Sequence, residues 1–208
     1  MTSSTENFIR NLLAQMTLEE KIGQLNQYHP REEQIAQVLR AGQAGSIINA
    51  AGALTGQAFS PSATAAQHNA FQQMALESSL KIPLLFGRDV IHGYRTIFPI
   101  PLAQAATFEP PLAEQAAAIA AREATAEGVN WTFAPMLDIA RDPRWGRVAE
   151  GNGEDPCLGA QMATALVRGV QGNDPAAPDR LIACAKHYAG YGAAEGGRDY
   201  EGGGIFGP

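Results

Sequence analysis

Side chains that could bind a ligand gather in three short stretches of the chain. The stretch 86–93 places the carboxylate of Asp89 shortly before the imidazole of His92. The stretch 141–147 holds three guanidinium groups and an indole within seven residues, and the third stretch opens with Lys186 and His187 side by side. Guanidinium and ammonium groups donate hydrogen bonds, a carboxylate accepts them and an imidazole can do either. Together these groups suit a ligand rich in hydroxyl or phosphate oxygens.

Two of the three stretches also have an ordinary structural explanation. Asp89 could cap a turn while His92 fills space. The arginine-rich stretch 141–147 could be a salt-bridged loop, a phosphate-binding cluster or a sugar site, because arginine pairs with carboxylates, phosphates and hydroxyls alike. The net negative charge of the chain disfavours phosphate without excluding it.

Signals for cofactors and metals are weak. The glycine-rich stretch 190–197 superficially resembles a dinucleotide-binding loop, but the sequence after it does not predict a helix. The four histidines and two cysteines show none of the close pair spacings of a metal site. We therefore expect no metal and no cofactor.

Helices and buried strands alternate along the chain and must position the three stretches. The segment Thr17–Glu20 has the form of a capping box, so a helix is expected to begin at Leu18. Apolar spacing and terminal glycines predict further helices over 32–40, 62–79, 112–127 and 156–171. Short apolar runs predict buried strands over 46–49, 84–88, 131–134 and 181–185.

This alternation is typical of a parallel α/β sheet, either an open doubly wound sheet or a (β/α) barrel. The three polar stretches follow the second, third and fourth predicted strands. Because ligands bind at the carboxyl ends of parallel strands, where the loops share one face, we expect the three stretches to form one functional face.

Composition narrows the class of protein. With 208 residues and 45% hydrophobic content, the chain is long enough for one domain with a core of its own. A formal net charge of −6 argues against nucleic acid and anionic membranes as partners. The N-terminus shows no signal peptide and no segment has transmembrane length, so a bacterial cytoplasm or periplasm is expected as the compartment. Both cysteines, Cys157 and Cys184, lie in apolar contexts and are expected to be buried thiols.

Several segments together resemble glycoside hydrolase family 3 β-glucosidases. Their order and spacing match over about residues 14 to 200, and the match is most specific in the arginine-tryptophan and lysine-histidine stretches. The segments are Thr17–Leu25, Asp89–Gly93, Phe98–Pro99, Phe133–Asp138, Arg141–Arg147, Gly153–Asp155, Lys186–Ala193 and Glu195–Arg198.

The resemblance implies a barrel domain whose pocket holds a terminal β-glucosyl unit. By motif position, Asp89 would accept hydrogen bonds from sugar hydroxyls, Arg147 would be the pocket arginine, and Lys186 and His187 would bind further hydroxyls. Arg141 and Arg144 would be structural. The β-N-acetylglucosaminidase branch of the family carries a histidine-bearing loop after its Lys-His pair, which 189–192 does not resemble, so β-glucosidase is favoured.

The resemblance also implies that the catalytic motifs are missing from this sequence. In the family, the nucleophile is an aspartate of a later Ser-Asp-Trp type motif, and the acid/base is a glutamate commonly supplied by a second domain. Neither motif occurs here, so no residue of this chain is expected to be catalytic. We expect residues 1–200 to be the first part, about half, of a (β/α)8 barrel domain, and 201–208 to be an atypical Gly-rich tail.

Three functions follow, in order of preference. The first is a retaining β-glucosidase acting on β-glucosides or cello-oligosaccharides in the complete protein, with this chain inactive alone and able to self-associate through exposed barrel edges. The second is a non-catalytic sugar-binding remnant. The third is a nucleotide-dependent α/β enzyme.

Overall fold

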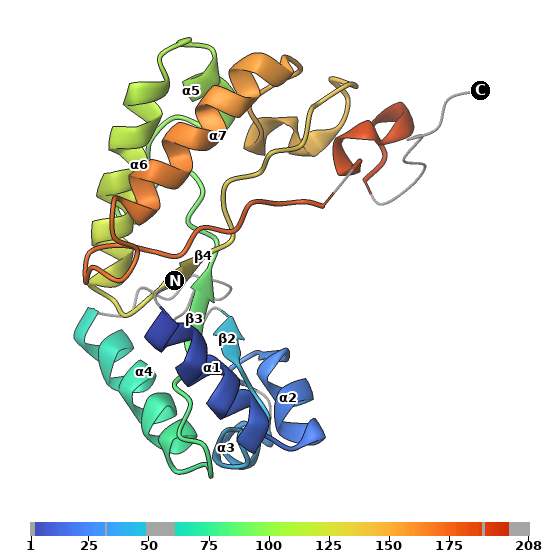
Figure 1. The fold of residues 1–208 in the computed structure, drawn as a ribbon. Helices are drawn as coiled ribbons and strands as arrows, with labels where there is room; N and C mark the ends of the chain where they lie inside the picture. The colour runs from blue at the N-terminus through green and yellow to red at the C-terminus, as the bar shows by residue number, and fades with distance from the viewer. Residues whose placement is uncertain (1–2, 32, 49–60, 189, 200–208) are drawn as a thin grey trace. The chain divides into compact units, whose positions relative to one another are not determined.

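The computed structural model describes residues 3–31, 33–48, 61–188 and 190–199. They belong to two compact units, Met1–Gly87 and Arg88–Pro208, whose elements are labelled in Figure 1. The predicted tail at 201–208 lies outside the described residues. Among the described helices, none combines the length and the apolar character needed to cross a membrane.

The first unit alternates helices with short strands. Its elements are α1 (Ser3–Gln15), α2 (Leu18–Gln24), β1 (Gln27–Tyr28), α3 (Ile35–Arg40), β2 (Ser46–Ile48), α4 (Pro61–Leu76) and β3 (Leu85–Arg88), whose last residue belongs to the second unit. The predicted capping box begins α2, because Thr17 Oγ1 accepts from the Glu20 amide at 3.1 Å and Glu20 Oε2 accepts from the Thr17 amide at 2.9 Å. Helix α1 and strand β1 were not predicted.

The strands run parallel and confirm the predicted α/β class. Strand β2 pairs with β1 on one side and with β3 on the other, with Ile47 opposite Tyr28 and Phe86, and the strand order is β1-β2-β3-β4. Buried apolar side chains join this sheet to α3 and α4; they include Leu39, Ile47, Phe71, Leu84 and Phe86. The core of the first unit therefore lies between the sheet and these two helices.

The second unit is built on a close pair of helices. Its elements are α5 (Pro101–Ala105), α6 (Pro110–Thr125), β4 (Trp131–Thr132), the 3-10 helix η1 (Gly146–Glu150), α7 (Pro156–Gln171) and the short 3-10 turns η2 (Tyr191–Ala193) and η3 (Glu195–Gly197). Figure 1 shows α6 and α7 side by side. Their close approach requires glycine at position 169, because an added Cβ there would lie only 2.4 Å from the Glu114 carbonyl oxygen. Helix α7 has the predicted bounds.

The predicted strand 181–185 is only partly formed. Its residues run parallel to 130–137, with bridges between Trp131 and Ile182 and between Met136 and Lys186. The amides of Ile182 and Cys184 donate to the carbonyls of Asn130 and Ala134 at 2.9 and 2.8 Å. The two bridges are five residues apart in 131–136 but four apart in 182–186, so the register shifts by one residue near Pro135, which also has no amide hydrogen to donate, and no continuous strand results. The predicted parallel direction of this segment holds, but the regular strand does not.

The expectation of two buried cysteines is wrong for Cys157, which is exposed, while Cys184 is half-buried. Cys157 stands in the first turn of α7, directly after Pro156. Its amide donates to Asp155 Oδ1 at 2.8 Å, which makes Asp155 the N-cap of the helix. Capping fixes the backbone there and leaves the thiol at the surface.

Candidate functional site

Asp89, directly after β3, contacts Lys186, which ends the segment bridged to Trp131 and Met136. The Lys186 ammonium lies 3.6 Å from Asp89 Oδ1, with the lysine side chain 16% and the aspartate side chain 51% exposed. The backbone beside Asp89 is fixed by the buried Thr132, whose hydroxyl accepts from the Val90 amide at 3.2 Å and donates to the Val90 carbonyl at 3.1 Å. The half-exposed carboxylate can therefore accept further hydrogen bonds next to a cation.

His187 is held by the buried Asp138. Oxygen Oδ2 of Asp138 lies 2.9 Å from His187 Nδ1 and accepts from the His187 amide at 3.1 Å. Parallel pairing brings these residues together, because the Leu137 amide donates to the Lys186 carbonyl at 2.6 Å. The Asp138 side chain is 2% exposed and that of His187 is 31% exposed, so the carboxylate is covered while the imidazole stays accessible.

Arg147 extends from η1 and is fixed by two partners. It donates from Nε and Nη2 to Glu150, each at 2.7 Å, and from Nη1 to the Tyr191 hydroxyl at 3.1 Å. The hydrogen bonds with Glu150 raise the pKa of Arg147. The same bonds lower the pKa of Glu150, and the charges of Arg147, Lys186 and His187 act in the same direction. The carboxylate is thus influenced by three of the predicted site residues.

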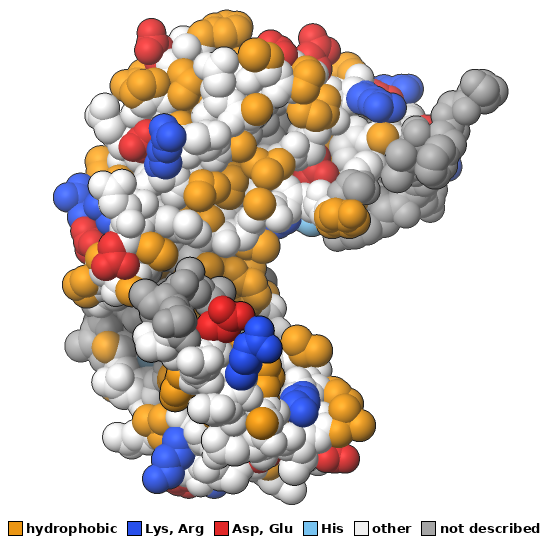
Figure 2. Space-filling model, in the orientation of Figure 1, with side chains coloured by type: hydrophobic (Ala, Val, Ile, Leu, Met, Phe, Trp, Pro, Cys, Tyr) orange, Lys and Arg blue, Asp and Glu red, His pale blue; other side chains and the backbone are white. Residues whose placement is uncertain are grey.

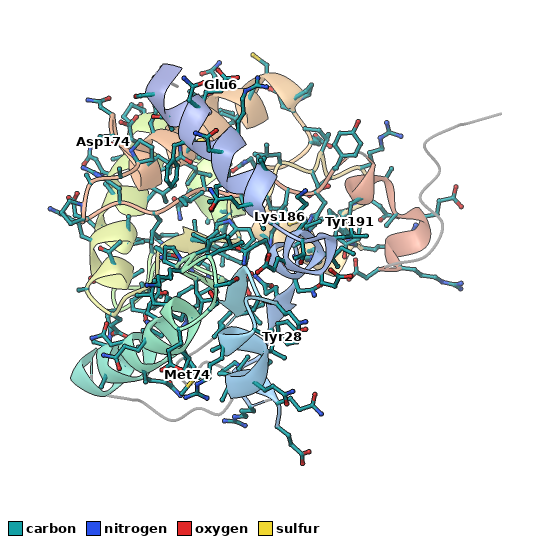
Figure 3. The ribbon with its side chains drawn as sticks, turned by 60° about the horizontal axis from the view of Figure 1, so that its bottom comes forward. Glu6, Tyr28, Met74, Asp174, Lys186 and Tyr191 are labelled. Carbon is teal, nitrogen blue, oxygen red and sulfur yellow. The ribbon has the colours of Figure 1, made fainter. Side chains whose placement is uncertain are left out.

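Tyr191 connects these groups to the glycine-rich segment. Its ring lies edge-on to His187 with centroids 4.6 Å apart and below the Arg147 guanidinium at 5.3 Å. Its hydroxyl donates to Asp199 Oδ1 at 2.7 Å, which also accepts from the buried Trp145 indole at 2.9 Å. Figure 3 labels Lys186 and Tyr191 in this part of the second unit.

The glycines of this segment permit close packing on the preceding loop. A Cβ at Gly192 would lie 2.3 Å from the Ile139 carbonyl oxygen, so only glycine fits there without a shift. The amide of Arg141 donates to the Gly192 carbonyl at 3.4 Å. Close packing therefore accounts for the glycine at position 192.

Arg144 takes part in a local ion pair. Its guanidinium donates to Asp142 from Nη2 at 2.7 Å and from Nε at 3.0 Å. The hydrogen bonds from Arg144 lower the pKa of Asp142 to about 2. The Arg144 side chain is 71% exposed, so this ion pair is a surface contact within the loop.

The structure thus groups the four predicted binding residues in two contacting sets, Asp89 with Lys186 and Arg147 with His187 through Tyr191. Sequence reasoning missed the contributions of Asp138, Glu150 and Tyr191. Asp138 and Tyr191 lay within recognised motifs, but nothing in the sequence showed which side chains they would contact. Among the residues that the structure describes, no three His, Cys, Asp or Glu side chains are placed to hold a metal ion.

A small cavity of the second unit adjoins these sets through Glu150, the partner of Arg147. Its volume is about 20 Å³, enough for about one water molecule. The lining includes His92, Gln104, Glu150 and apolar residues of α6 and α7, and none of the four predicted binding residues. A sugar does not fit there.

Comparison with known proteins gives a consistent result. Residues 17–203 match the sequence profile described as the glycosyl hydrolase family 3 N terminal domain. The periplasmic beta-glucosidase of Salmonella typhimurium is 42% identical over 198 residues, which cover 93% of this chain and 24% of that protein. The chain therefore spans about a quarter of the length of this relative.

Solved structures agree in fold. The beta-glucosidase of Listeria innocua in complex with isofagomine matches with a TM-score of 0.79 at 38% identity, over 95% of this chain and 27% of its own. The exo-1,3/1,4-beta-glucanase of a Pseudoalteromonas species matches with a TM-score of 0.85 at 32% identity, over 95% and 26%. These matches confirm the predicted fold class, the first part of a (β/α)8 barrel.

Proposed function

Starting from the fact that this chain belongs to glycosyl hydrolase family 3, we propose that it forms the glucosyl-binding part of a retaining β-glucosidase. In this proposal Asp89, Arg147, Lys186 and His187 bind the hydroxyl groups of a terminal β-glucosyl unit of β-glucosides or cello-oligosaccharides. The nucleophile and the acid/base lie outside residues 1–208, and this chain alone does not cleave its ligand. The name of the Salmonella relative favours the periplasm as the compartment.

The observation that carries the proposal is the contact between Asp89 and Lys186. A carboxylate that is 51% exposed and lies 3.6 Å from an ammonium offers acceptors and donors side by side. Each hydroxyl of a sugar both donates and accepts, so it can bridge such a pair. The negative carboxylate also argues against a phosphate ligand at this position, because like charges repel.

Binding of glucose by this chain tests the proposal. We expect saturation-transfer NMR to detect glucose on the wild type, and Asp89→Asn to weaken binding by about tenfold through loss of a charge-assisted hydrogen bond. Asp174→Asn is the matched control. This carboxylate accepts from the Ala176 amide at 3.0 Å in a surface turn and is labelled in Figure 3 well apart from Lys186.

The outcomes separate the three functions. Glucose binding by the chain, with turnover only in a polypeptide that also carries the two catalytic carboxylates, supports the β-glucosidase. Glucose binding without turnover in the full polypeptide supports the sugar-binding remnant. Protection from unfolding by a dinucleotide, with no effect of glucose, would support the nucleotide-dependent enzyme and overturn the proposal.

A further inference from the structure

The Asp138 side chain contacts both the backbone and the ring of His187. Its Oδ2 atom accepts from the His187 amide at 3.1 Å and contacts His187 Nδ1 at 2.9 Å. A carboxylate that is only 2% exposed needs such hydrogen bonds, because burial of a charge without partners is costly. One buried atom thus fixes both the backbone and the ring of the same histidine.

This geometry determines which ring nitrogen carries the hydrogen in neutral His187. An ionised carboxylate can only accept, so Nδ1 must be the donor of the 2.9 Å contact. The other ring nitrogen, Nε2, then has a lone pair and is an acceptor. Tyr191, edge-on at 4.6 Å and 73°, packs against the ring and limits its rotation. A flipped ring would lose the bond to Asp138.

The charged groups around His187 come from three segments. Asp138 bonds to it directly, Lys186 precedes it in the chain, and Glu150 is electrostatically coupled to it. The Tyr191 ring that packs against His187 also contacts the Arg147 guanidinium. Since Lys186 and Arg147 can only donate, an acceptor at His187 would complement them.

We propose that Asp138 is a positioning residue, which holds neutral His187 with hydrogen on Nδ1 so that Nε2 accepts a hydrogen bond from a ligand hydroxyl. The inference rests on the proposed function, since the hydroxyl belongs to the glucosyl unit bound there. Nε2 of His187 accepts a hydrogen bond from one ligand hydroxyl, while the Lys186 ammonium donates to a neighbouring oxygen of the ligand.

The tautomer can be measured without any sugar. The chain is labelled with ¹⁵N-histidine, and the ring nitrogens are observed at a pH at which histidine is neutral. Solution spectra are used, or magic-angle-spinning spectra of sedimented protein where the chain self-associates. Signals of His187 are those missing from His187→Gln. We expect hydrogen on Nδ1 in the wild type; hydrogen on Nε2, or the mixture found in unstructured histidine, would overturn the inference.

Variants of Asp138 separate positioning from general packing. Asp138→Leu keeps the volume but removes the acceptor, so the Nε2–H tautomer should become the major form. Asp138→Asn retains an oxygen that can accept and should preserve the wild-type tautomer. The control is Asp142→Leu, which removes a carboxylate of the same loop that bonds to Arg144. An unchanged tautomer in Asp138→Leu, or an equal change in Asp142→Leu, contradicts the inference; if Asp138→Leu does not fold, the wild-type spectrum decides.

Glucose affinity links the tautomer to the ligand. Asp138→Leu should weaken glucose binding by about tenfold, the loss expected for roughly one hydrogen bond, while Asp138→Asn should retain most of the affinity. Equal affinity in wild type and Asp138→Leu would overturn the inference and leave the proposed function intact. Absence of binding by the wild type would overturn the proposed function and the sugar role of His187, even where the tautomer is the expected one.

Discussion

Glu150 receives two hydrogen bonds from the guanidinium of Arg147, from Nε and from Nη2, each at 2.7 Å. This two-point contact orients the planar arginine, and the Tyr191 hydroxyl accepts its third hydrogen bond at 3.1 Å. Glu150 and Tyr191 therefore hold Arg147 in one orientation, which in the proposed site would reduce the entropy lost on binding.

Replacing Glu150 by glutamine should lower stability in a pH-dependent way. The hydrogen bonds from Arg147 lower the pKa of Glu150 in the folded chain, so its contribution is present above the ordinary value of 4.5 and is lost as the pH falls through the lowered pKa. For this partly exposed pair we expect Glu150→Gln to cost about 1 kcal/mol at neutral pH. The difference in melting temperature between wild type and variant should shrink as the solution is acidified below 4.5.

The control for this experiment is Glu154→Gln, an exposed carboxylate a few residues further along the chain. We expect it to change stability by less than about 0.5 kcal/mol at any pH. A difference between wild type and Glu150→Gln that stays constant down to acid pH would mean that the ionised form of Glu150 does not stabilise the fold.

In a complete enzyme that contains this chain, Asp89→Ala should reduce kcat/KM on an aryl β-glucoside at least roughly tenfold. The carboxylate is expected to make charge-assisted hydrogen bonds worth about 1.5 to 3 kcal/mol each, and about 1.4 kcal/mol corresponds to tenfold. Steady-state kinetics with Asp174→Ala as the control measures the effect. An unchanged kcat/KM would remove Asp89 from the binding site.

The isolated chain should self-associate. Large apolar side chains are strongly exposed in both units, among them Leu25 at 87%, Phe108 at 73% and Ile97 at 68%, and hydrophobic side chains appear in orange in Figure 2. Exposed apolar surface and unpaired strand edges favour association. Light scattering after size exclusion and binding of a hydrophobic dye test this, and Leu25→Gln should reduce dye binding. A monodisperse monomer that melts cooperatively and binds no dye would be the contrary result.

The purified chain should release no nitrophenol from p-nitrophenyl β-glucoside. Retaining hydrolysis needs two carboxylates about 5 to 5.5 Å apart on opposite faces of the sugar. Neither sequence motif of the catalytic pair occurs in residues 1–208. Asp138, for its part, is buried against His187 and therefore unsuited to act as a nucleophile. An Asp89→Ala preparation reveals contaminating host enzyme; turnover that disappears in this variant would show that the chain alone is catalytic.

Local signals carried most of the fold prediction. The capping box at Thr17 and the proline and glycine at the two ends of α7 act over a few residues, so both can be recognised in the sequence. The interruption at Pro135, the exposure of Cys157 and the bond between Asp138 and His187 depend on which segments pack together. Periodicity contains no information about such partners. The positions of the candidate residues after the predicted strands were readable, whereas the groups that orient them were not.

The parallel pairing of 130–137 with 182–186 also constrains how the length of this chain can vary. Lys186 lies opposite Met136, so one residue inserted between Ile182 and Lys186 would bring a different residue to that position and move Lys186 and His187 away from Asp89 and Asp138. The turn 173–180 after α7 is mostly exposed and can absorb added residues at its surface. Homologues should therefore differ in the spacing from α7 to Leu181 and keep that from Leu181 to Lys186 constant.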